Sequence, residues 1–399
     1  MRGPISTGPV PAVVVGGSLN GLGVVRSLAK GGVPVFVLET TRRSPAVWSR
    51  HCTHLRVPSL AGETLIDALA GVASGFDCRP VLLLTTDESV NAVSAARARI
   101  DALYRIDLPA AAMVEALADK GQFHALAERE GFAVPRSRTL SAATDLDRLE
   151  ALEPPIVLKP ADKTLVLAGT VERAVRADTV AQARAAAGRM LTRASSLIAQ
   201  EWVEGADTDI FFTLFACDRE AKLAGMFPGR KLVCWPPAVG STAVCVAAPE
   251  AADELGRQTR RFIERVGYRG LGSLEFKRDA RTGRYVIIEP TVGRTDWQEE
   301  IATLCGVNLP LLAYWTALRA SLPPQHEGAF ERYAWRAERQ FAVPRALVTP
   351  GTRVIDGYFR WSDPLPGTYY YGYERLAVRA WRRAIRLKRR LSPQTAEAH

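Results

Sequence analysis

The sequence predicts an α/β and α+β protein, in which an open parallel sheet at the N-terminus precedes a mixed region. Three observations predict this class. Over the first ~110 residues, apolar strand patterns alternate with helix patterns, as in parallel sheets covered by helices. After Pro135 a different succession of strands and helices begins and continues for about 200 residues. The composition is 47% apolar and 24% charged over 399 residues, which excludes a mainly disordered chain.

The N-terminal unit is predicted to be Rossmann-like and to span residues 1–112. Apolar or β-branched runs are expected as strands at 11–16, 33–39 and 81–85, with helices at 21–31, 62–73 and 88–104. Strands that are apolar throughout are typical of a parallel sheet buried on both faces. We therefore expect an open α/β sheet covered by helices on both sides.

The second unit, 113–322, is expected to be mixed α+β, and a C-terminal extension covers 323–399. The unit begins with a helical stretch at 112–131. Its further strands are expected at 156–159, 196–203, 210–216, 243–247 and 285–289, and its helices at 174–192 and 251–266. The extension holds an aromatic cluster that we expect to be core, formed by Tyr358, Phe359, Trp361, Tyr369, Tyr370, Tyr371 and Tyr373. A basic helix is expected after it.

The net charge of +10 is concentrated in the C-terminal segment 375–390. That segment contains eight Lys/Arg and no acid, so the remainder has 44 basic and 42 acidic residues, or +2. A nearly neutral body does not support a basic groove, and no nucleic-acid partner is expected. Apolar residues in steps of three and four favour a helix packed on the body. Contact of 375–390 with an anionic membrane surface is the alternative, followed by nucleic-acid contact.

The sequence favours a cytoplasmic protein, with membrane association through 375–390 left open. It has no uninterrupted apolar run of about 18 residues, and its N-terminus lacks the features of a signal peptide. The six cysteines are scattered without C-x-x-C, so we expect reduced core residues rather than disulfides or zinc ligands. No ligand spacing is found for the histidines, and no chemistry is assigned to His51, His54, His124 and His326.

A glycine cluster, GGSLNGLG at 16–23, follows the first strand and opens the first helix. Glycines at such a turn let the backbone approach a ligand, and the helix N-terminus favours an anion. Glu39 ends the second strand, where a dinucleotide fold would place a ribose-binding acid. The spacing does not give G-x-G-x-x-G, so a tight turn in a domain that binds no dinucleotide is favoured. Binding of part of another substrate and an NAD or FAD site are the alternatives.

The segment 272–298 carries the most informative acidic pair. Glu275 lies in the apolar stretch LGSLEF and Glu289 ends RYVIIE, with a hairpin turn predicted at 279–283. Two antiparallel strands joined by that turn would place both carboxylates side by side on one face. Neighbouring carboxylates repel each other, so the pair is expected to need bridging cations. Such oxygen ligands suit Mg²⁺, which takes its other ligands from water and substrate phosphates.

Basic residues upstream are candidates to neutralise those phosphates. Lys120 begins a helix pattern, Lys159 ends the strand PPIVLK, and Lys231 lies in FPGRKLVCWPP. An ammonium at the end of a buried strand is costly unless an anion meets it, so Lys159 indicates an anion in a cleft. A solvated helix lysine at 120 and loop charges at 230–231 are the alternatives.

Four motifs in this order resemble those of the ATP-grasp superfamily, carboxylate–amine ligase type. They are Asp119-Lys120 leading to GFAVP at 131–135, VLKP at 157–160, AQEWVEG at 199–205, and LEF at 274–276 with IEP at 288–290. The resemblance covers roughly residues 1–320. It implies an α/β N-terminal domain followed by a two-lobed ATP-grasp fold, with a small lobe at about 113–203 and a large lobe at about 204–322.

The resemblance also implies a nucleotide-binding set. Phosphates would be bound by Lys120 and Lys159, together with Lys163 in the flap 160–170. The adenine slot would be formed by Gln200, Glu201, Trp202 and Val203, with the contacts of Glu201 and Val203 made largely through backbone groups. The ribose would be bound by Asp207, for which a turn cap is the alternative. Family flaps are usually glycine-rich, whereas this one contains Gly169 alone.

For the metal and the reaction, the resemblance implies a second set. Glu275 and Glu289 would hold Mg²⁺, with Mn²⁺ as a substitute, and structural salt bridges are the alternative. Thr291 stands where the family commonly has Asn, so its hydroxyl would complete the site with altered geometry. Lys231 and Arg294 would be catalytic residues that neutralise the transferred phosphoryl group. Arg294 lies one position later than usual, and pairing with Asp296, Glu299 or Glu300 is its alternative.

The function implied is an ADP-forming carbon–nitrogen ligase that uses ATP and Mg²⁺. A carboxylate would be converted to an acyl phosphate and then joined to an amine. An amino acid or similar small acid is expected as one substrate, and an amino acid, a sugar amine or a cell-envelope precursor as the other. The alternatives are a nucleotide-binding protein without turnover and an NAD/FAD-dependent oxidoreductase. A homodimer is left open.

Overall fold

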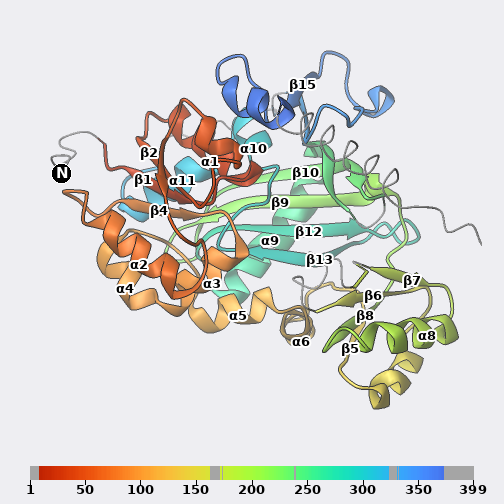
Figure 1. Ribbon diagram of the computed structural model, residues 1–399. Coiled ribbons are helices and arrows are strands. Elements are labelled where there is room, and N and C mark those ends of the chain that lie inside the picture. The colour runs from red at the N-terminus through yellow and green to blue at the C-terminus, as the bar shows by residue number, and fades with distance from the viewer. Residues whose placement is uncertain are drawn as a thin grey trace, which may run out of the picture.

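The computed structural model describes residues 9–161, 171–172, 174–237, 240–322, 330 and 332–372. Three sheets form the framework of this part of the chain (Figure 1). The first contains four strands near the N-terminus, the second four strands of a small lobe, and the third seven strands. Flap residues 162–170, which include Lys163, lie outside the described residues, as does the basic segment 375–390.

The N-terminal sheet has the strand order β3-β2-β1-β4, and all of its pairings are parallel. Its strands are β1 (Ala12–Val15), β2 (Val35–Glu39), β3 (Thr53–Arg56) and β4 (Val81–Leu84), and its helices are α1 (Leu19–Lys30), α2 (Gly62–Ala73), α3 (Asp87–Ala95) and α4 (Arg97–Leu103). The parallel sheet is confirmed. The edge strand β3 was not expected, because its residues THLR give no apolar run.

Two helices, not one continuous helix, connect this sheet to the small lobe. The stretch 112–131 divides into α5 (Ala111–Ala118) and α6 (Lys120–Glu130). Asp119 separates them, because its side chain accepts a hydrogen bond from the backbone N–H of Gln122 and so caps α6. Lys120 is therefore the first residue of a helix, as predicted. Gly131 ends α6 with φ of 66°, a conformation that glycine adopts without strain.

The small lobe is a sheet of order β5-β8-β6-β7 with its own core. Its elements are β5 (Ser137–Leu140), β6 (Ile156–Pro160), β7 (Val175–Ala177), α8 (Val180–Leu191) and β8 (Leu197–Glu201). Apolar residues of α8 pack on β6 and β8 in a cluster separate from the other two cores. The expectation of a helix over 174–192 is wrong for its first residues. Val175–Ala177 pairs with β6, and Thr179 then caps α8.

The seven-stranded sheet has the order β13-β12-β9-β10-β11-β14-β15. Its strands are β9 (Ile210–Cys217), β10 (Leu223–Trp235), β11 (Ser241–Ala247), β12 (Gly270–Arg278), β13 (Tyr285–Val292), β14 (Tyr333–Arg336) and β15 (Arg353–Asp356), and its helices are α9 (Ala252–Val266), α10 (Glu300–Leu304) and α11 (Leu309–Leu318). The segment 230–231, considered above as loop charges, lies instead within β10. Position 229 of β10 requires glycine, because a side chain there would collide with the ring of Phe212 on β9.

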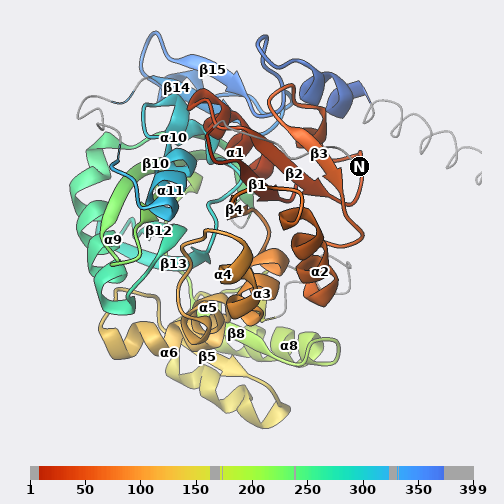
Figure 2. The same ribbon diagram turned by 90° about the vertical axis from the view of Figure 1, so that its left-hand side faces the viewer.

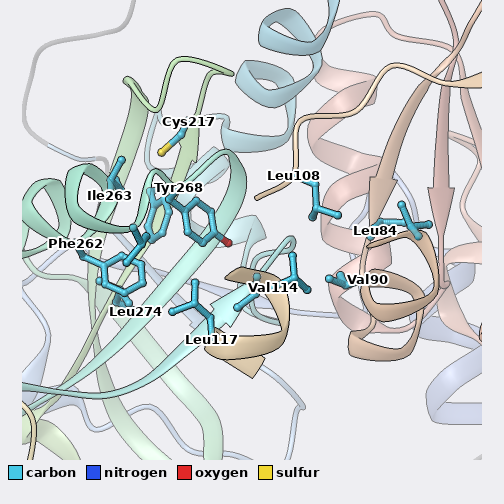
Figure 3. Packing of buried hydrophobic residues seen from close by; sticks show 14 of the residues in the cluster. Leu84, Val90, Leu108, Val114, Leu117, Cys217, Phe262, Ile263, Tyr268 and Leu274 are labelled. Atoms are coloured by element: carbon cyan, nitrogen blue, oxygen red, sulfur yellow. The ribbon is translucent and has the colours of Figure 1, made fainter. Parts of the chain in front are cut away.

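The side chains of β9 point alternately to the two faces of this sheet, and both faces are covered by helices. Phe211 and Phe215 pack toward α9, whereas Phe212 and Leu214 pack toward α11 and α1. The α9 core continues without interruption to Leu84 and Val90 of the N-terminal unit (Figure 3). On the opposite face, α1 lies against α10 and α11 (Figure 2). The N-terminal sheet is thus joined to the seven-stranded sheet on both faces.

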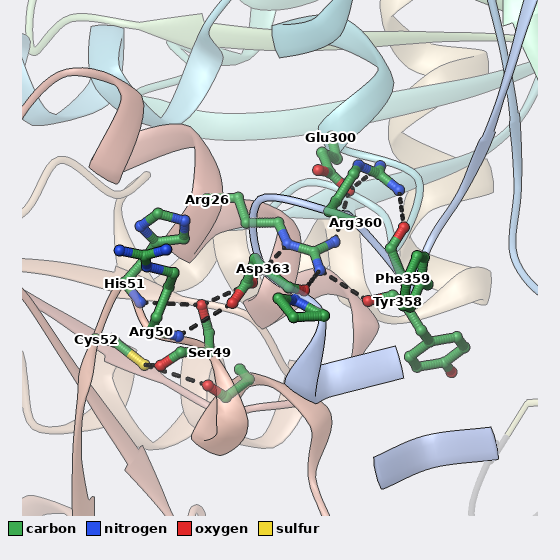
Figure 4. Close-up of polar contacts among 12 residues, drawn as sticks. Arg26, Ser49, Arg50, His51, Cys52, Glu300, Tyr358, Phe359, Arg360 and Asp363 are labelled. Atoms are coloured by element: carbon green, nitrogen blue, oxygen red, sulfur yellow. Dashed lines mark hydrogen bonds and ion pairs between the residues drawn. The ribbon is translucent and has the colours of Figure 1, made fainter. Parts of the chain in front are cut away.

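A buried ionic cluster attaches the end of the described chain to α1 (Figure 4). Arg26 donates to Asp363 at 3.0 Å and lies 3.4 Å from Glu300, which also pairs with Arg360 at 2.7 Å. Asp363 accepts further hydrogen bonds from the Ser49 hydroxyl and the Arg50 backbone N–H. Residues 357–363 are thus held by three other segments of the chain.

The aromatic cluster is core only in part. Tyr358 is buried and stacks on Tyr370 with ring centroids 3.6 Å apart. Trp361, in contrast, is 90% exposed, so the expectation of core is wrong at this residue. Tyr373 lies outside the described residues.

The cysteines of the described chain are unpaired, and four of the six are buried as expected. Cys78 is exposed, because it lies in the connection that precedes β4, and the core prediction is wrong there. Among the helices that the structure describes, none combines the length and apolar character needed to cross a membrane.

Candidate active site

The acidic pair lies on neighbouring strands in direct register. β12 and β13 are antiparallel, and Glu275 is the Cα partner of Glu289. Residues opposite each other in an antiparallel pair project from the same face of the sheet, so the predicted juxtaposition of the two carboxylates is confirmed. The register shifts after Glu275, because Ile288 is an extra residue on β13. Thr291 follows two positions after Glu289 and shares its face.

Lys231 supplies a cation to this pair from β10. Its Nζ lies 2.5 Å from Oε2 of Glu275, and the lysine is only 3% exposed. Burial opposes the charge on the ammonium, but the surrounding groups, Glu275 foremost, together outweigh that effect and raise the pKa of Lys231. The lysine is therefore charged at neutral pH. One ammonium and two carboxylates leave this part of the site with one net negative charge, which a bound cation would offset.

A pocket between the small lobe and β13 brings together four of the predicted residues. Lys120 of α6, Lys159 of β6, Gln200 of β8 and Glu289 of β13 all contribute to its walls. These residues are up to 169 positions apart in the chain, and three separate elements of the small-lobe side face one strand of the large sheet. Glu275 lies beside this pocket as the strand partner of Glu289, and Lys231 binds Glu275.

Lys159 is oriented by a buried hydrogen-bonded chain. Its Nζ donates to Oε1 of Gln200 at 3.2 Å, and Nε2 of Gln200 lies 3.1 Å from Nε2 of His124. Burial, followed by the charges of Lys159 and Lys120, lowers the pKa of His124 to about 4. The imidazole is neutral at pH 7. Sequence reasoning assigned this histidine no chemistry, although it lies four residues after Lys120 and hence on the same side of one helix.

The segment after β8 carries the predicted adenine and ribose residues. The Glu201 side chain accepts from the Glu153 backbone N–H at 3.0 Å and pairs with Arg136, and its backbone N–H donates to the Arg136 carbonyl. The backbone N–H of Trp202 donates to the carbonyl of Pro155. Val203 continues this segment. Nothing here contradicts the predicted backbone contacts of 201 and 203, which stay predictions.

Asp207 makes a structural contact within the protein. Its Oδ2 accepts a hydrogen bond from the backbone N–H of Cys234 at 2.9 Å, which ties the short 3-10 helix Asp207–Asp209 to the end of β10. This is a structural role of the kind expected of a turn cap. Its predicted contact with a ribose stays a prediction.

Lys277 is a site residue that sequence reasoning missed. It lies two positions after Glu275 on β12, and so on the same face, and it is 6% exposed. Its Nζ donates to the carbonyls of Gly205 and Ala206 at 2.9 and 2.8 Å. Burial lowers its pKa, although Asp209 and Asp207 oppose that change. Its spacing of two from Glu275 along a strand was the signal that could have identified it.

Arg294 links the site to the N-terminal unit. Its guanidinium binds Asp87 at the start of α3 at 2.7 Å and lies 3.6 Å from Asp296. Asp296 accepts from the Thr291 hydroxyl at 3.3 Å. The alternative pairing of Arg294 with Asp296 is therefore observed, whereas Glu299 and Glu300 make other contacts. Its role in catalysis stays a prediction.

The glycine turn is explained by packing. Gly16 has φ of 97°, and a Cβ on Gly21 would lie 2.1 Å from the carbonyl oxygen of Gly16. Glu39 is buried and accepts from the N–H groups of Gly17 and Thr40, at 2.8 and 2.7 Å. One carboxylate oxygen of Glu39 thus binds the glycine turn and the other binds the neighbouring Thr40, which favours the structural interpretation over a ribose contact.

Comparison with known proteins agrees with this architecture. An N5-carboxyaminoimidazole ribonucleotide synthetase solved as an ADP complex superposes with a TM-score of 0.63 at 14% identity, over 83% of this chain and 82% of that one. The N5-carboxyaminoimidazole synthetase from Staphylococcus aureus gives 0.61 at 15% identity over 81% of each chain. The chain has an ATP-grasp fold. Biotin carboxylase from Campylobacter jejuni, solved with β-γ-ATP, gives 0.62 at 12% identity over 81% of this chain and 74% of that one.

Similarity of sequence is weaker than similarity of fold. No family model matches the chain. The D-aspartate ligase of Enterococcus faecium (strain Aus0004) is 24% identical over 210 residues, which are 49% of each protein. The match thus spans about half the length of that relative. Within the ATP-grasp fold, the small lobe and the β12–β13 hairpin face each other across the pocket described above.

Proposed function

We propose that this protein is an ATP- and Mg²⁺-dependent ligase that joins a carboxylate to an amine and releases ADP and phosphate. One observation carries the proposal most: Lys120, Lys159 and Glu289 share a pocket, and Glu289 faces Glu275 across two strands. A triphosphate with a bound divalent cation has the charges that this arrangement complements. The fold supports the same conclusion, because several proteins that share it were solved with ADP or an ATP analogue.

The donor set fits Mg²⁺. Glu275 and Glu289 offer carboxylate oxygens on one face, and the Thr291 hydroxyl lies on the same face two residues further along. Among the described residues no larger group of acidic, histidine and cysteine side chains gathers in one place. Mg²⁺ commonly binds one or two carboxylates and takes the remaining oxygens from phosphates and water. When bound, it would offset the repulsion between phosphate oxygens. The same ligands would also bind Mn²⁺.

In the reaction, a carboxylate oxygen of the first substrate would attack the γ-phosphorus of ATP. The bond from that phosphorus to the bridging oxygen would break, giving an acyl phosphate and ADP. Lys159, held by Gln200, and Lys120 would position the phosphates, while Lys231 and Arg294 would neutralise the transferred group. An amine would then attack the acyl carbon, phosphate would leave with the C–O bond electrons, and the nitrogen would lose a proton to give an amide.

The proposal assigns five residues to the nucleoside, namely Gln200, Glu201, Trp202, Val203 and Asp207. The segment lies between β8 and the end of β10, beside the pocket that holds Lys159. The lobes 113–203 and 204–322 would clamp the nucleotide, with 1–112 and 323–399 as flanking units. Closure of the lobes would exclude water, which otherwise hydrolyses an acyl phosphate.

The test is a screen for ADP release against a panel of acids and amines. D-aspartate belongs in the panel because the relative by sequence is named a D-aspartate ligase. Bicarbonate belongs there because a biotin carboxylase domain of the same fold was solved with it. We expect ADP only when one acid and one amine are both present, and an amide of the two in the product mixture. Binding of ATP without such release for any pair would instead support the nucleotide-binding protein without turnover.

A further inference from the structure

His124 lies beside the phosphate-binding lysines, and the reaction proposed above does not use it. It is 7% exposed and contributes to the same pocket as Lys120, Lys159 and Glu289. We infer that His124 binds a phosphate oxygen of the nucleotide through Nδ1, as a neutral hydrogen-bond donor. The inference rests on the proposed function, because it requires a nucleotide phosphate in this pocket.

The hydrogen-bonded chain fixes which ring nitrogen carries the proton. Oε1 of Gln200 accepts from the Lys159 ammonium, which has no acceptor capacity of its own. The other end of the Gln200 amide, Nε2, is therefore a donor, and it faces Nε2 of His124 at 3.1 Å. The histidine nitrogen must accept at that position, so the neutral ring carries its proton on Nδ1.

That Nδ1 is buried and makes no hydrogen bond within the described chain. Buried donors are nearly always satisfied in folded proteins, so a donor without a partner in a pocket wall indicates a group that arrives with a ligand. The neighbouring side chains identify its chemistry. Two ammonium groups line the same pocket, which favours an anion, and phosphate oxygens accept several hydrogen bonds at once.

A neutral donor suits this position better than a third cation. Lys120 and Lys159 already supply two positive charges, and a protonated ring between them would be repelled by both. The histidine adds a hydrogen bond without adding charge, and its contact with Gln200 also holds the amide that orients Lys159. The opposing carboxylate of Glu289 is balanced in the proposed function by the divalent cation.

Two substitutions separate the two ring nitrogens. The amide nitrogen of Asn occupies the place of Nδ1, whereas the end of a Gln side chain reaches the place of Nε2. His124→Asn therefore keeps the proposed donor and loses the acceptor for Gln200. His124→Gln keeps an acceptor for Gln200 and loses the donor. Both variants are polar and of similar volume, and their thermal midpoints and circular dichroism report whether each has folded.

Isothermal titration calorimetry with Mg²⁺ then measures the binding of ATP, ADP and adenosine to the full chain. Loss of a hydrogen bond to a charged group corresponds to about 10- to 100-fold in affinity. We expect that loss for ATP and ADP in His124→Gln, a smaller loss of below about 10-fold in His124→Asn, where only the support of Gln200 and Lys159 is weakened, and no change for adenosine in either variant. An equal loss in both variants, or an equal loss for adenosine and ATP, would overturn the inference.

The outcomes also distinguish this inference from the proposed function. If the wild type binds no ATP in the presence of Mg²⁺, the proposed function fails and the inference fails with it. If the wild type binds ATP and His124→Gln binds it equally well, the inference alone is refuted. Should His124→Gln not fold, His124→Asn remains decisive, because a loss of more than about 10-fold in a variant that keeps the donor would refute it.

Discussion

Glu299, the residue before α10, is fully buried under α1, and the structure makes a specific prediction about its charge. The polar contacts of its carboxyl in the described residues are the hydroxyls of Ser27 and Thr303, at 3.2 and 3.3 Å. A Cβ on Gly23 would lie 2.9 Å from its Oε2, so α1 covers it closely. Burial, with a further contribution from the charge of Glu300, raises the pKa of Glu299 from 4.5 to about 8. The carboxyl is therefore protonated at neutral pH.

The difference in pKa between the folded and unfolded chain makes the stability depend on pH. Between pH 4.5 and 8 the folded protein holds one proton more than the unfolded chain, so the free energy of unfolding falls as pH rises. One unit of pKa corresponds to about 1.4 kcal/mol, which gives about 5 kcal/mol in total for Glu299. The stabilisation is complete below pH 4.5 and is lost as pH rises through 8.

Glu299→Gln replaces the neutral carboxyl with a neutral amide, so it removes this pH dependence. Urea unfolding of both proteins from pH 5 to pH 9 measures it. We expect the free energy of unfolding of the variant, relative to the wild type, to rise by about 4 kcal/mol over this range. Glu264→Gln on the exposed face of α9 is the control, because the same chemical change at an exposed site should leave the pH dependence of stability as in the wild type. Parallel pH curves for Glu299→Gln and the wild type would refute the reasoning.

Two further predictions concern a buried cation each. Arg26→Met leaves Asp363 and Glu300 with fewer cationic partners. Breaking a buried ion pair costs about 3–5 kcal/mol, so differential scanning calorimetry should show a lower midpoint of unfolding. An unchanged midpoint would contradict the stabilising role of this cluster. Lys277→Met removes the donor to the carbonyls of Gly205 and Ala206, which lie within the segment assigned to the nucleoside. The KM for ATP should therefore rise about 5- to 10-fold in the ADP-release assay, with kcat nearly unchanged. A fall in kcat alone would contradict this assignment.

The main elements of the site could be predicted because local sequence patterns determine them. An apolar strand ending in Lys159 and a hairpin between two apolar strands carrying Glu275 and Glu289 follow from periodicity and turn residues alone. The cap at Asp119 was also present in the sequence, although we expected one helix across it. In each case the residues that determine the element lie within a few positions of one another.

Features that depend on distant segments could not be predicted in this way. β10 contains Pro228 and Gly229, which argue against a strand, and only the ring of Phe212 on the next strand explains the glycine. The contact of Gln200 with His124 joins residues 76 positions apart. Sequence spacing alone gave His124 no partner, since histidine ligand motifs assume that the partners are close in the chain.

The central claim is that Glu275 and Glu289 bind a divalent cation together with the phosphates of ATP. The thermal midpoint with ATP, with and without Mg²⁺, tests it most directly in the wild type and in Glu289→Gln, with Glu264→Gln on the exposed face of α9 as the control. We predict that Mg²⁺ increases the stabilisation by ATP in the wild type and the control but not in Glu289→Gln. A full Mg²⁺-dependent increase in Glu289→Gln would contradict the claim.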